Sequence, residues 1–211
     1  MKKLLVCVCG IAAAFVLAAQ APADVIVYYS FTNATSTADT GSSISTLTYS
    51  HTGTSANSWL SGTTVNAQPG FVAGNAIGMN GWDGDASYFQ FTLDASLWHS
   101  NVVSWASNRS STGPPNVILK YSTNGVGGTF YDFATYTVTT TAALFGPADF
   151  STTPGLDYNA NVVFRLVGTG TTATGGTMKV DNFTIVAIPE PSTIMLIGVG
   201  LLGLLALRHR S

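Results

Sequence analysis

The side chains with the clearest chemistry in this sequence are the two aspartates of Asp83-Gly84-Asp85. Carboxylates spaced by a glycine supply the hard oxygen ligands that calcium prefers in proteins. Asp181, which precedes Asn182 in the last predicted strand, is a second oxygen-rich position. We therefore take Asp83, Asp85 and Asp181 as candidate calcium ligands. A plain polar turn at the aspartate pair is the simpler interpretation, which we favour, and a calcium loop is the alternative.

A hydrolytic mechanism would use a different set of side chains. A glycosidase needs two carboxylates at the scissile bond, and the single glutamate of the chain, Glu190, lies near its end. Nucleophilic catalysis needs a serine or cysteine with a base in reach, but the central region has only His51 and His99 and no G-x-S-x-G pattern. We predict a non-enzymatic protein. The alternative is a secreted hydrolase of a polymer that uses Asp83, Asp85 or His99.

Arg109, Trp82 and Trp98 are the candidates for direct contact with a ligand. Arg109 lies in the loop Asn-Arg-Ser-Ser-Thr-Gly-Pro-Pro-Asn (108–116), and its planar guanidinium could bind a carboxylate or a sugar hydroxyl. The simpler role for Arg109, which we favour, is to hold the loop by donating to backbone carbonyls. Trp82 and Trp98 lie near predicted loops, where an indole could stack on a sugar ring, whereas Trp105 is expected in the core.

The elements that must position these residues are short strands. Phe89, Phe91 and Leu93 share one face of an extended segment, and Arg165 in mid-strand is expected to find a partner. Asn124-Gly125 is a strong hairpin-turn signal. Strands at a spacing of about 8–12 residues predict an all-β fold, an antiparallel β-sandwich of the jelly-roll type. The expected strands are 25–31, 44–50, 71–79, 87–93, 101–107, 116–122, 131–138, 161–167 and 177–186.

The N-terminus has the pattern of a secretory signal peptide. Lys2 and Lys3 precede an apolar stretch over 4–19, and small residues follow at 21–23. We predict that signal peptidase cleaves after Ala23. A retained N-terminal anchor is the alternative, although the apolar stretch is short for a spanning helix, which needs about 20 residues.

The predicted mature domain, residues 24–188, has few charges and no cysteine. Four basic and nine acidic side chains give it a formal net charge of −5. No basic stripe is present, so we predict no nucleic-acid partner. Cys7 and Cys9 both lie in the predicted signal peptide. The exported domain must therefore be stabilised by its hydrophobic core rather than by disulfides.

The C-terminus combines a Pro-Glu-Pro motif, an apolar run and a basic tip. Residues 194–207 are uninterrupted apolar residues, which as a helix would be about 21 Å long, shorter than a hydrocarbon core of about 30 Å. Arg208 and Arg210 would stay on the cytoplasmic side by the positive-inside rule. The expected structure is a single hydrophobic helix that holds the chain weakly in the inner membrane.

These features resemble the PEP-CTERM sorting signal of Gram-negative bacteria. The resemblance covers 189–211, and the basic tip departs from an all-arginine run by having His209. It implies that Pro189, Glu190 and Pro191 are recognised by an exosortase, a membrane cysteine transpeptidase. It also implies a transient inner-membrane anchor, followed by delivery to the cell surface or the extracellular space.

The central region also resembles a jelly-roll domain of secreted PEP-CTERM proteins, and galactose-binding-like and laminin-G-like modules. This similarity covers most of 25–187, and its motifs are largely structural. The chain divides into a signal peptide (1–23), a β-sandwich (24–188) and a sorting segment (189–211). We expect a surface or matrix protein that contacts polysaccharide, with a self-associating structural protein as a further alternative.

Overall fold

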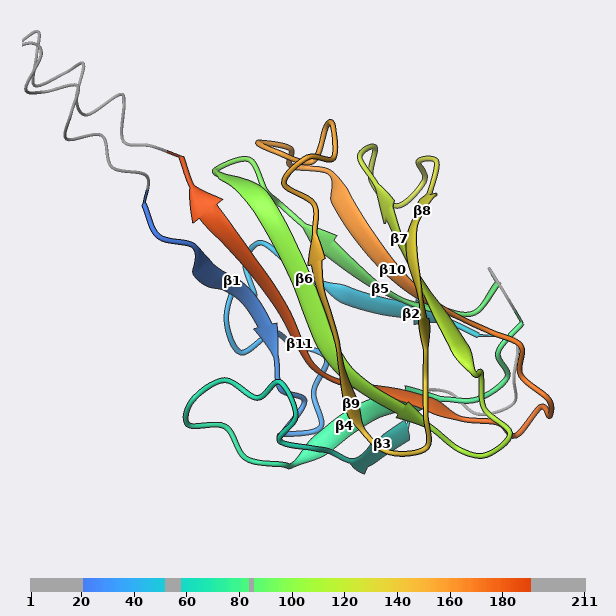
Figure 1. The fold of residues 1–211 in the computed structure, drawn as a ribbon. Coiled ribbons are helices and arrows are strands. Elements are labelled where there is room, and N and C mark those ends of the chain that lie inside the picture. The colour runs from blue at the N-terminus through green and yellow to red at the C-terminus, as the bar shows by residue number, and fades with distance from the viewer. Residues whose placement is uncertain (1–20, 52–57, 84–85, 191–211) are drawn as a thin grey trace, which may run out of the picture.

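The computed structural model describes residues 21–51, 58–83 and 86–190. Within these ranges the chain folds as two antiparallel sheets that pack face to face (Figure 1). The strands are β1 (Asp24–Tyr29), β2 (Leu47–Ser50), β3 (Ser58–Ser61), β4 (Asn75–Met79), β5 (Tyr88–Leu93), β6 (Trp98–Arg109), β7 (Asn116–Ser122), β8 (Tyr131–Thr137), β9 (Ala143–Asp149), β10 (Val162–Thr169) and β11 (Met178–Pro189).

The first sheet has the order β3-β4-β11-β6-β9, and β1 also pairs with β11. The second sheet has the order β2-β5-β10-β7-β8. All the pairings are antiparallel, as expected for a sandwich. The predicted fold class, an all-β sandwich, is confirmed. In the described part of the chain, no helix is long and apolar enough to cross a membrane.

The core lies between the two sheets and is rich in aromatic rings. Phe91 of β5 stacks on Phe183 of β11, with ring centroids 3.6 Å apart and planes at 2°. Trp105 of β6 is fully buried, as predicted, and stacks on Phe145 of β9 at 5.7 Å. Such pairs contribute about 1 kcal/mol each beyond the area that they bury. Inward-facing aromatic residues therefore join the sheets without any disulfide.

Nine of the observed strands overlap the predicted ones, whereas β3 and β9 were not predicted. The predicted strands differ from the observed ones mainly at their ends. The largest difference at one end is the start of β4, which was predicted at residue 71 and lies at Asn75, and β6 extends beyond its prediction at both ends. β9 reads Ala-Leu-Phe-Gly-Pro-Ala-Asp, and its Gly146-Pro147 pair resembles a turn. β9 lies at the edge of its sheet, where a proline removes no needed ladder hydrogen bond.

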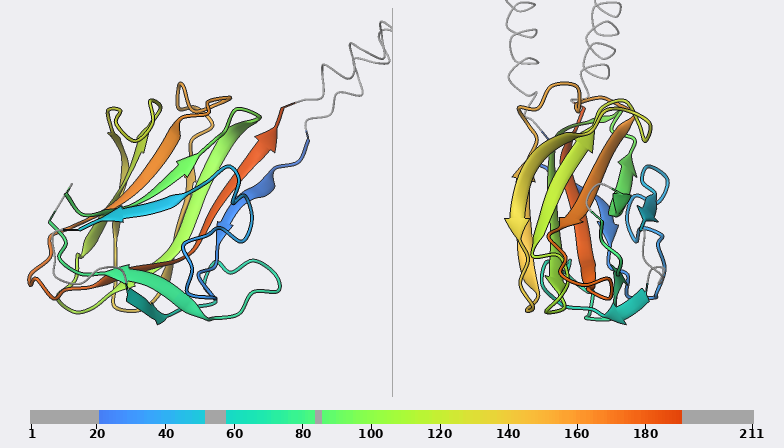
Figure 2. Two further views of the ribbon diagram at one scale, coloured as in Figure 1. Left: turned by 180° about the vertical axis from the view of Figure 1, so that it is seen from behind. Right: turned by 90° about the vertical axis from the view of Figure 1, so that its right-hand side faces the viewer.

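Strands β6 and β11 connect the two ends of the domain. They run antiparallel side by side, with Lys179 opposite Asn108 at one end and Pro189 opposite Trp98 at the other. β1 pairs with the same end of β11, with Asp24 opposite Ala187. Both ends of the described chain therefore lie at one end of the domain (Figure 2), and β3 and β4 lie toward the other (Figure 1).

Candidate ligand-binding pocket

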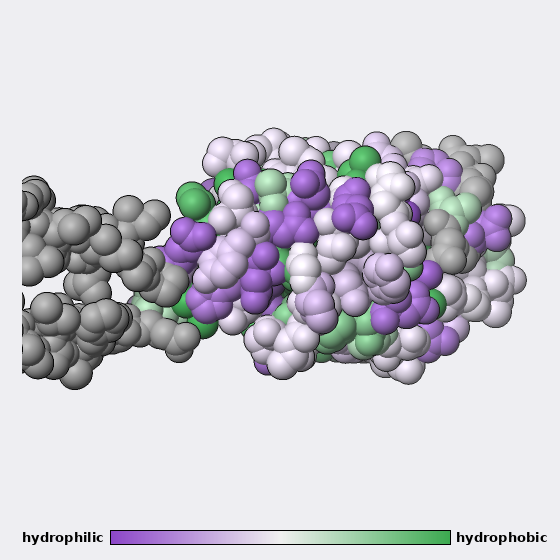
Figure 3. Space-filling model, turned by 90° about the horizontal axis from the view of Figure 1, so that it is seen from above, coloured by the Kyte–Doolittle hydropathy of each residue, from purple (hydrophilic) through white to green (hydrophobic). Residues whose placement is uncertain are grey.

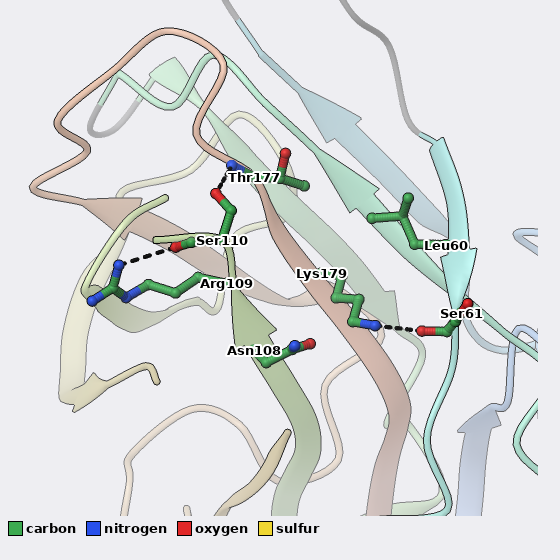
Figure 4. Close-up of a pocket in the computed structure, with 7 residues that line it drawn as sticks. All are labelled: Leu60, Ser61, Asn108, Arg109, Ser110, Thr177 and Lys179. Atoms are coloured by element: carbon green, nitrogen blue, oxygen red, sulfur yellow. Dashed lines mark hydrogen bonds between the residues drawn. The ribbon is translucent and has the colours of Figure 1, made fainter. Parts of the chain in front are cut away.

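A pocket of about 380 Å³ opens at the end of the first sheet that is distant from the chain ends. Strands β3, β6 and β11 and the residues next to them supply its walls (Figure 4). This volume falls within the range of about 300–1,000 Å³ for small-molecule sites. The lining residues are Leu60, Ser61, Asn108, Arg109, Ser110, Thr177 and Lys179.

Strand register brings the pocket residues together. Lys179 of β11 pairs with Asn108 of β6 on one side and with Gly78 of β4 on the other. The glycine at position 78 leaves room there, because a Cβ atom would lie 2.6 Å from a methyl of Leu60 and would displace that side chain. Lys179 can therefore extend past Gly78 toward β3, where its ammonium donates a hydrogen bond to the carbonyl of Ser61 (Figure 4).

Arg109 holds its own loop, the role that we favoured from the sequence. Its Nε donates to the carbonyl of Val138 at 2.8 Å. Its Nη1 donates to the carbonyls of Ser110, Ser111 and Gly113, at 3.0, 2.8 and 3.3 Å. In Figure 4 the guanidinium points toward its own loop and away from Lys179. A direct contact between Arg109 and a ligand stays a prediction.

Asn108 contributes an acceptor that the protein leaves unused. Its Nδ2 donates to the carbonyl of Thr140 at 3.1 Å, whereas its Oδ1 is enclosed and accepts no hydrogen bond from the described residues. A buried acceptor without a donor costs about 1–3 kcal/mol. Because Oδ1 is enclosed, a ligand in the pocket does not reach it in this conformation of the side chain. Lys179 and Asn108 were not among our predicted site residues.

Asp181, a candidate calcium ligand, fixes a loop instead. Its two oxygens accept the backbone N–H groups of Thr63 at 2.7 Å and Asn182 at 2.9 Å. The Asn182 side chain donates to the carbonyls of Thr63 and Val65 at 2.7 and 2.8 Å. Desolvation by burial raises the pKa of Asp181 to about 6. Backbone N–H groups aimed at both oxygens suit a carboxylate that anchors the loop after β3 rather than one that binds a cation.

Because the carboxyl group of Asp181 is buried, we expect the free energy of unfolding to fall as the pH rises from about 4 to about 6 and to level off above that. Its pKa is raised in the folded chain, so the folded state holds a proton that the unfolded state has released. The stabilisation is complete below pH 3.8 and is lost as the pH rises through about 6. We expect the urea midpoint of the wild type to decrease over this range, and that of Asp181→Asn to change less.

Two other aspartates act in the opposite sense but at lower pH. Hydrogen bonds from Ser96 and Ser151 lower the pKa values of Asp94 and Asp149 below 3.8, so their contributions disappear only on strong acidification. A wild-type midpoint that stays level or increases between about pH 4 and about pH 6 would contradict the role given to Asp181.

The predicted aspartate pair and the two tryptophans have different environments. Asp83 is exposed, and Asp85 lies outside the described residues, so the calcium prediction for this pair stays a prediction. Among the residues that the structure describes, no three His, Cys, Asp or Glu side chains gather as a metal site would require. Trp82 is buried against Phe89, and its Nε1 donates to the carbonyl of Met79, so the ring is not exposed for stacking. Trp98 is half-buried at the opposite end of β6 from the pocket.

Arg165 has the structural partners that its mid-strand position predicted. Its Nε donates to Oε1 of Gln90 at 2.8 Å, and Gln90 in turn donates to Oγ1 of Thr48 at 3.0 Å. The guanidinium lies between the rings of Tyr88 and Phe130, 4.0 and 3.5 Å from their centroids. This arrangement stabilises the outer face of the second sheet and keeps the rings of Tyr88 and Phe130 against the cation.

His99 lacks the surroundings of a catalytic base. Its Nδ1 lies 2.9 Å from Oγ of Ser100, but the Asp157 carboxylate accepts the backbone N–H of Ser100 and not an imidazole N–H. A Ser-His-Asp triad needs an acid that orients the imidazole. The contacts of His99 in the described chain therefore do not favour hydrolysis.

The sorting motif begins inside the sheet. Pro189 is the last residue of β11, opposite Trp98, and the backbone N–H of Glu190 donates to the carbonyl of Leu97 at 2.9 Å. Pro191, the apolar run 194–207 and the basic residues Arg208 and Arg210 lie outside the described residues, as does most of the predicted signal peptide.

Comparison with solved structures places the fold among β-sandwich carbohydrate-binding modules. The CBM22-1 xylan-binding domain from Paenibacillus barcinonensis Xyn10C matches with a TM-score of 0.52 and 13% identity, over 81% of this chain and 99% of that domain. The tandem CBM22-1–CBM22-2 domain of the same protein matches with the same score and identity, over 81% of this chain and 47% of the tandem chain. At this identity the likeness shows the fold alone.

Comparison of the sequence identifies the C-terminal segment. Residues 187–211 match the PEP-CTERM protein-sorting motif. This motif marks an exported protein that passes through the membrane and is sorted to the cell surface. No curated protein sequence matches the chain significantly. The chain therefore combines a PEP-CTERM sorting motif with a sandwich of the carbohydrate-binding-module type.

Proposed function

We propose that this chain is an exported, non-enzymatic surface protein that binds acidic polysaccharide through the pocket between β3, β6 and β11. Signal peptidase removes residues 1–23, and residues 194–207 hold the chain transiently in the inner membrane of a Gram-negative cell. An exosortase then acts at Pro189, Glu190 and Pro191. The folded domain remains at the cell surface or in the extracellular matrix.

The charge distribution around the pocket supports an acidic ligand. The domain has a formal net charge of −5 and only four basic side chains, and two of these, Arg109 and Lys179, line the pocket. The ammonium of Lys179 attracts an anionic group of the ligand, whereas the net negative charge of the domain opposes non-specific binding of an acidic polymer elsewhere on its surface. A uronic acid or another carboxylated sugar fits this chemistry.

The other pocket residues suit the hydroxyl groups of a sugar. The serines at positions 61 and 110 provide hydroxyls. Leu60 adds an apolar wall, of the kind that packs on the C–H face of a sugar ring. A lysine donates up to three hydrogen bonds, and Lys179 uses one of them for Ser61. The ammonium therefore has the capacity to bind a carboxylate of the ligand.

Replacing Lys179 tests the pocket directly. We expect Lys179→Gln to weaken binding to the producer's acidic polysaccharide about tenfold or more, since a hydrogen bond to a charged group is worth about 1.5–3 kcal/mol. Lys120→Gln is the matched control, because it removes the same charge from β7 in the other sheet, where Lys120 pairs with Asp132 at 3.0 Å. Isothermal titration calorimetry measures both variants. Equal affinity of the two variants would contradict the assignment of the pocket.

The other candidate functions give different outcomes in the same preparation. Chelator-sensitive binding would favour the predicted calcium ligands Asp83 and Asp85. Turnover of a polymer that Asp85→Asn abolishes would favour the secreted hydrolase. Concentration-dependent assembly without polysaccharide would favour a purely structural, self-associating matrix protein.

A further inference from the structure

The end of the domain opposite the pocket carries an exposed apolar surface that the proposed binding function does not use. It consists of Leu97, Trp98, Tyr158 and Ile188, which we call the exit patch. Leu97 is 62% exposed and Tyr158 is 46% exposed, and Trp98 and Ile188 are half-buried. Figure 3 shows apolar residues at the end of the domain where the described chain ends.

Backbone contacts join the exit patch to the sorting motif. Pro189 pairs with Trp98, Glu190 donates to the carbonyl of Leu97, and the N–H of Tyr158 donates to the carbonyl of Trp98 at 2.9 Å. The chain therefore leaves the domain from the middle of the exit patch and not from a free linker.

The number of residues beyond Glu190 limits the distance between the exit patch and the membrane. The apolar run begins at residue 194, four residues after Glu190. Four residues span at most about 14 Å when fully extended, and the headgroup layer of a bilayer is about 5–8 Å thick. When the run is held in the membrane, Leu97 must lie at the headgroups or just above them.

The composition of the exit patch suits this depth. Tryptophan and tyrosine are enriched at membrane–water interfaces, where the ring is in the apolar layer and the polar atom reaches water. Three carboxylates flank the patch, those of Asp94, Asp157 and Glu190. They oppose deep insertion and limit attraction to anionic lipid. We therefore expect the exit patch to stay at a bilayer while the C-terminal apolar run is anchored there, and to leave the bilayer once this run is removed.

Tyr158 combines a partly exposed ring, whose centroid lies 5.5 Å from that of His99, with a strained backbone. This residue has a φ of 54°, in the left-handed region, where asparagine and glycine are relaxed and a tyrosine is strained. An asparagine would serve the turn better.

We propose that the exit patch docks the folded domain on the phospholipid surface while the sorting segment is held in the membrane. This inference rests on the anchoring part of the proposed function. In the docked state β6 leads away from the bilayer, and the ten residues from Trp98 to Asn108 span about 33 Å. Docking therefore directs the polysaccharide pocket away from the membrane.

The experiment uses the chain from Asp24 to the C-terminus inserted into phosphatidylcholine vesicles. This form has no cysteine, so a single introduced cysteine can be labelled with an environment-sensitive fluorophore. Ser96→Cys places the label beside the exit patch, and Ala173→Cys places it in an exposed loop before β11. We expect blue-shifted emission at position 96 and water-like emission at position 173. Leu97→Ser combined with Tyr158→Asn should reduce the docked fraction about tenfold, because it removes the two most exposed apolar side chains of the patch.

Two controls separate docking from anchoring and from folding. The first control is resistance to alkaline extraction, which should be unchanged in the double variant because the tail still holds the chain in the membrane. The second control is the urea midpoint, which should not fall because asparagine relieves the backbone strain at position 158. Water-like emission at position 96 in a wild-type chain that resists extraction would overturn docking and leave anchoring in place. A wild-type chain that is extracted freely would overturn both.

Discussion

Deleting Pro189, Glu190 and Pro191 is expected to leave the chain unprocessed in the inner membrane. These residues match the sorting motif, and their removal takes away the site that an exosortase would recognise. The apolar run 194–207 remains, and we expect it to retain the chain as the proposed anchor. Fractionation followed by mass spectrometry of the intact chain should show the domain with its C-terminal tail attached, and none of it at the cell surface.

The structure indicates that this deletion tests sorting rather than folding. Pro189 is the last residue of β11, and Glu190 makes one backbone hydrogen bond, to Leu97. The buried part of β11, up to Ala187, is unchanged. Glu190→Gln is a milder variant that keeps this hydrogen bond and removes only the carboxylate. Surface delivery of the deletion variant at the wild-type level would show that the motif is not needed.

Phe183→Ala is expected to cause the largest loss of stability of any single core substitution that we consider. Phe183 is fully buried on β11, stacked on Phe91 at 3.6 Å and edge-on to Tyr29 at 6.3 Å. Truncating a buried phenylalanine costs about 3–5 kcal/mol, and a domain of this size has a stability of about 5–15 kcal/mol in total. No disulfide in the mature chain offsets this loss.

The measurement is chemical denaturation followed by tryptophan fluorescence. The matched control is Val126→Ala, because Val126 is 56% exposed in the loop between β7 and β8, and we expect this substitution to change the stability by less than about 0.5 kcal/mol. Similar midpoints for Phe183→Ala and Val126→Ala would show that the two sheets are not joined by the aromatic core described above.

Local patterns predicted most of the fold. The alternation of side chains over 87–93 predicted which residues of β5 are buried. The same period-two pattern places Trp105 on one face with Val103 and predicted that Trp105 is buried, because side chains in a strand alternate between two faces. β9 was missed because Gly146-Pro147 is a turn signal at nearly every other place. Only the pairing of β9 with β6 at the sheet edge makes this sequence a strand.

The pocket could not be predicted in the same way. Asn108 and Lys179 are distant in the sequence and meet only because β6 and β11 pair in one register. Neither residue lies in a motif, whereas Arg109, the neighbour of Asn108, stood out because its loop is unusual. The exit patch depends in the same way on Tyr158 and Trp98, which the turn before β10 brings together.

The most direct test of the proposed function changes the charge of the ligand and leaves the protein as it is. The purified wild-type chain is titrated with the producer's acidic polysaccharide, and with the same polymer after chemical reduction of its carboxyl groups, at low and at high salt. We predict saturable binding to the acidic polymer that weakens with salt, and binding to the reduced polymer that is about tenfold weaker or more. Equal binding to the two polymers, or no binding to either, would contradict the account.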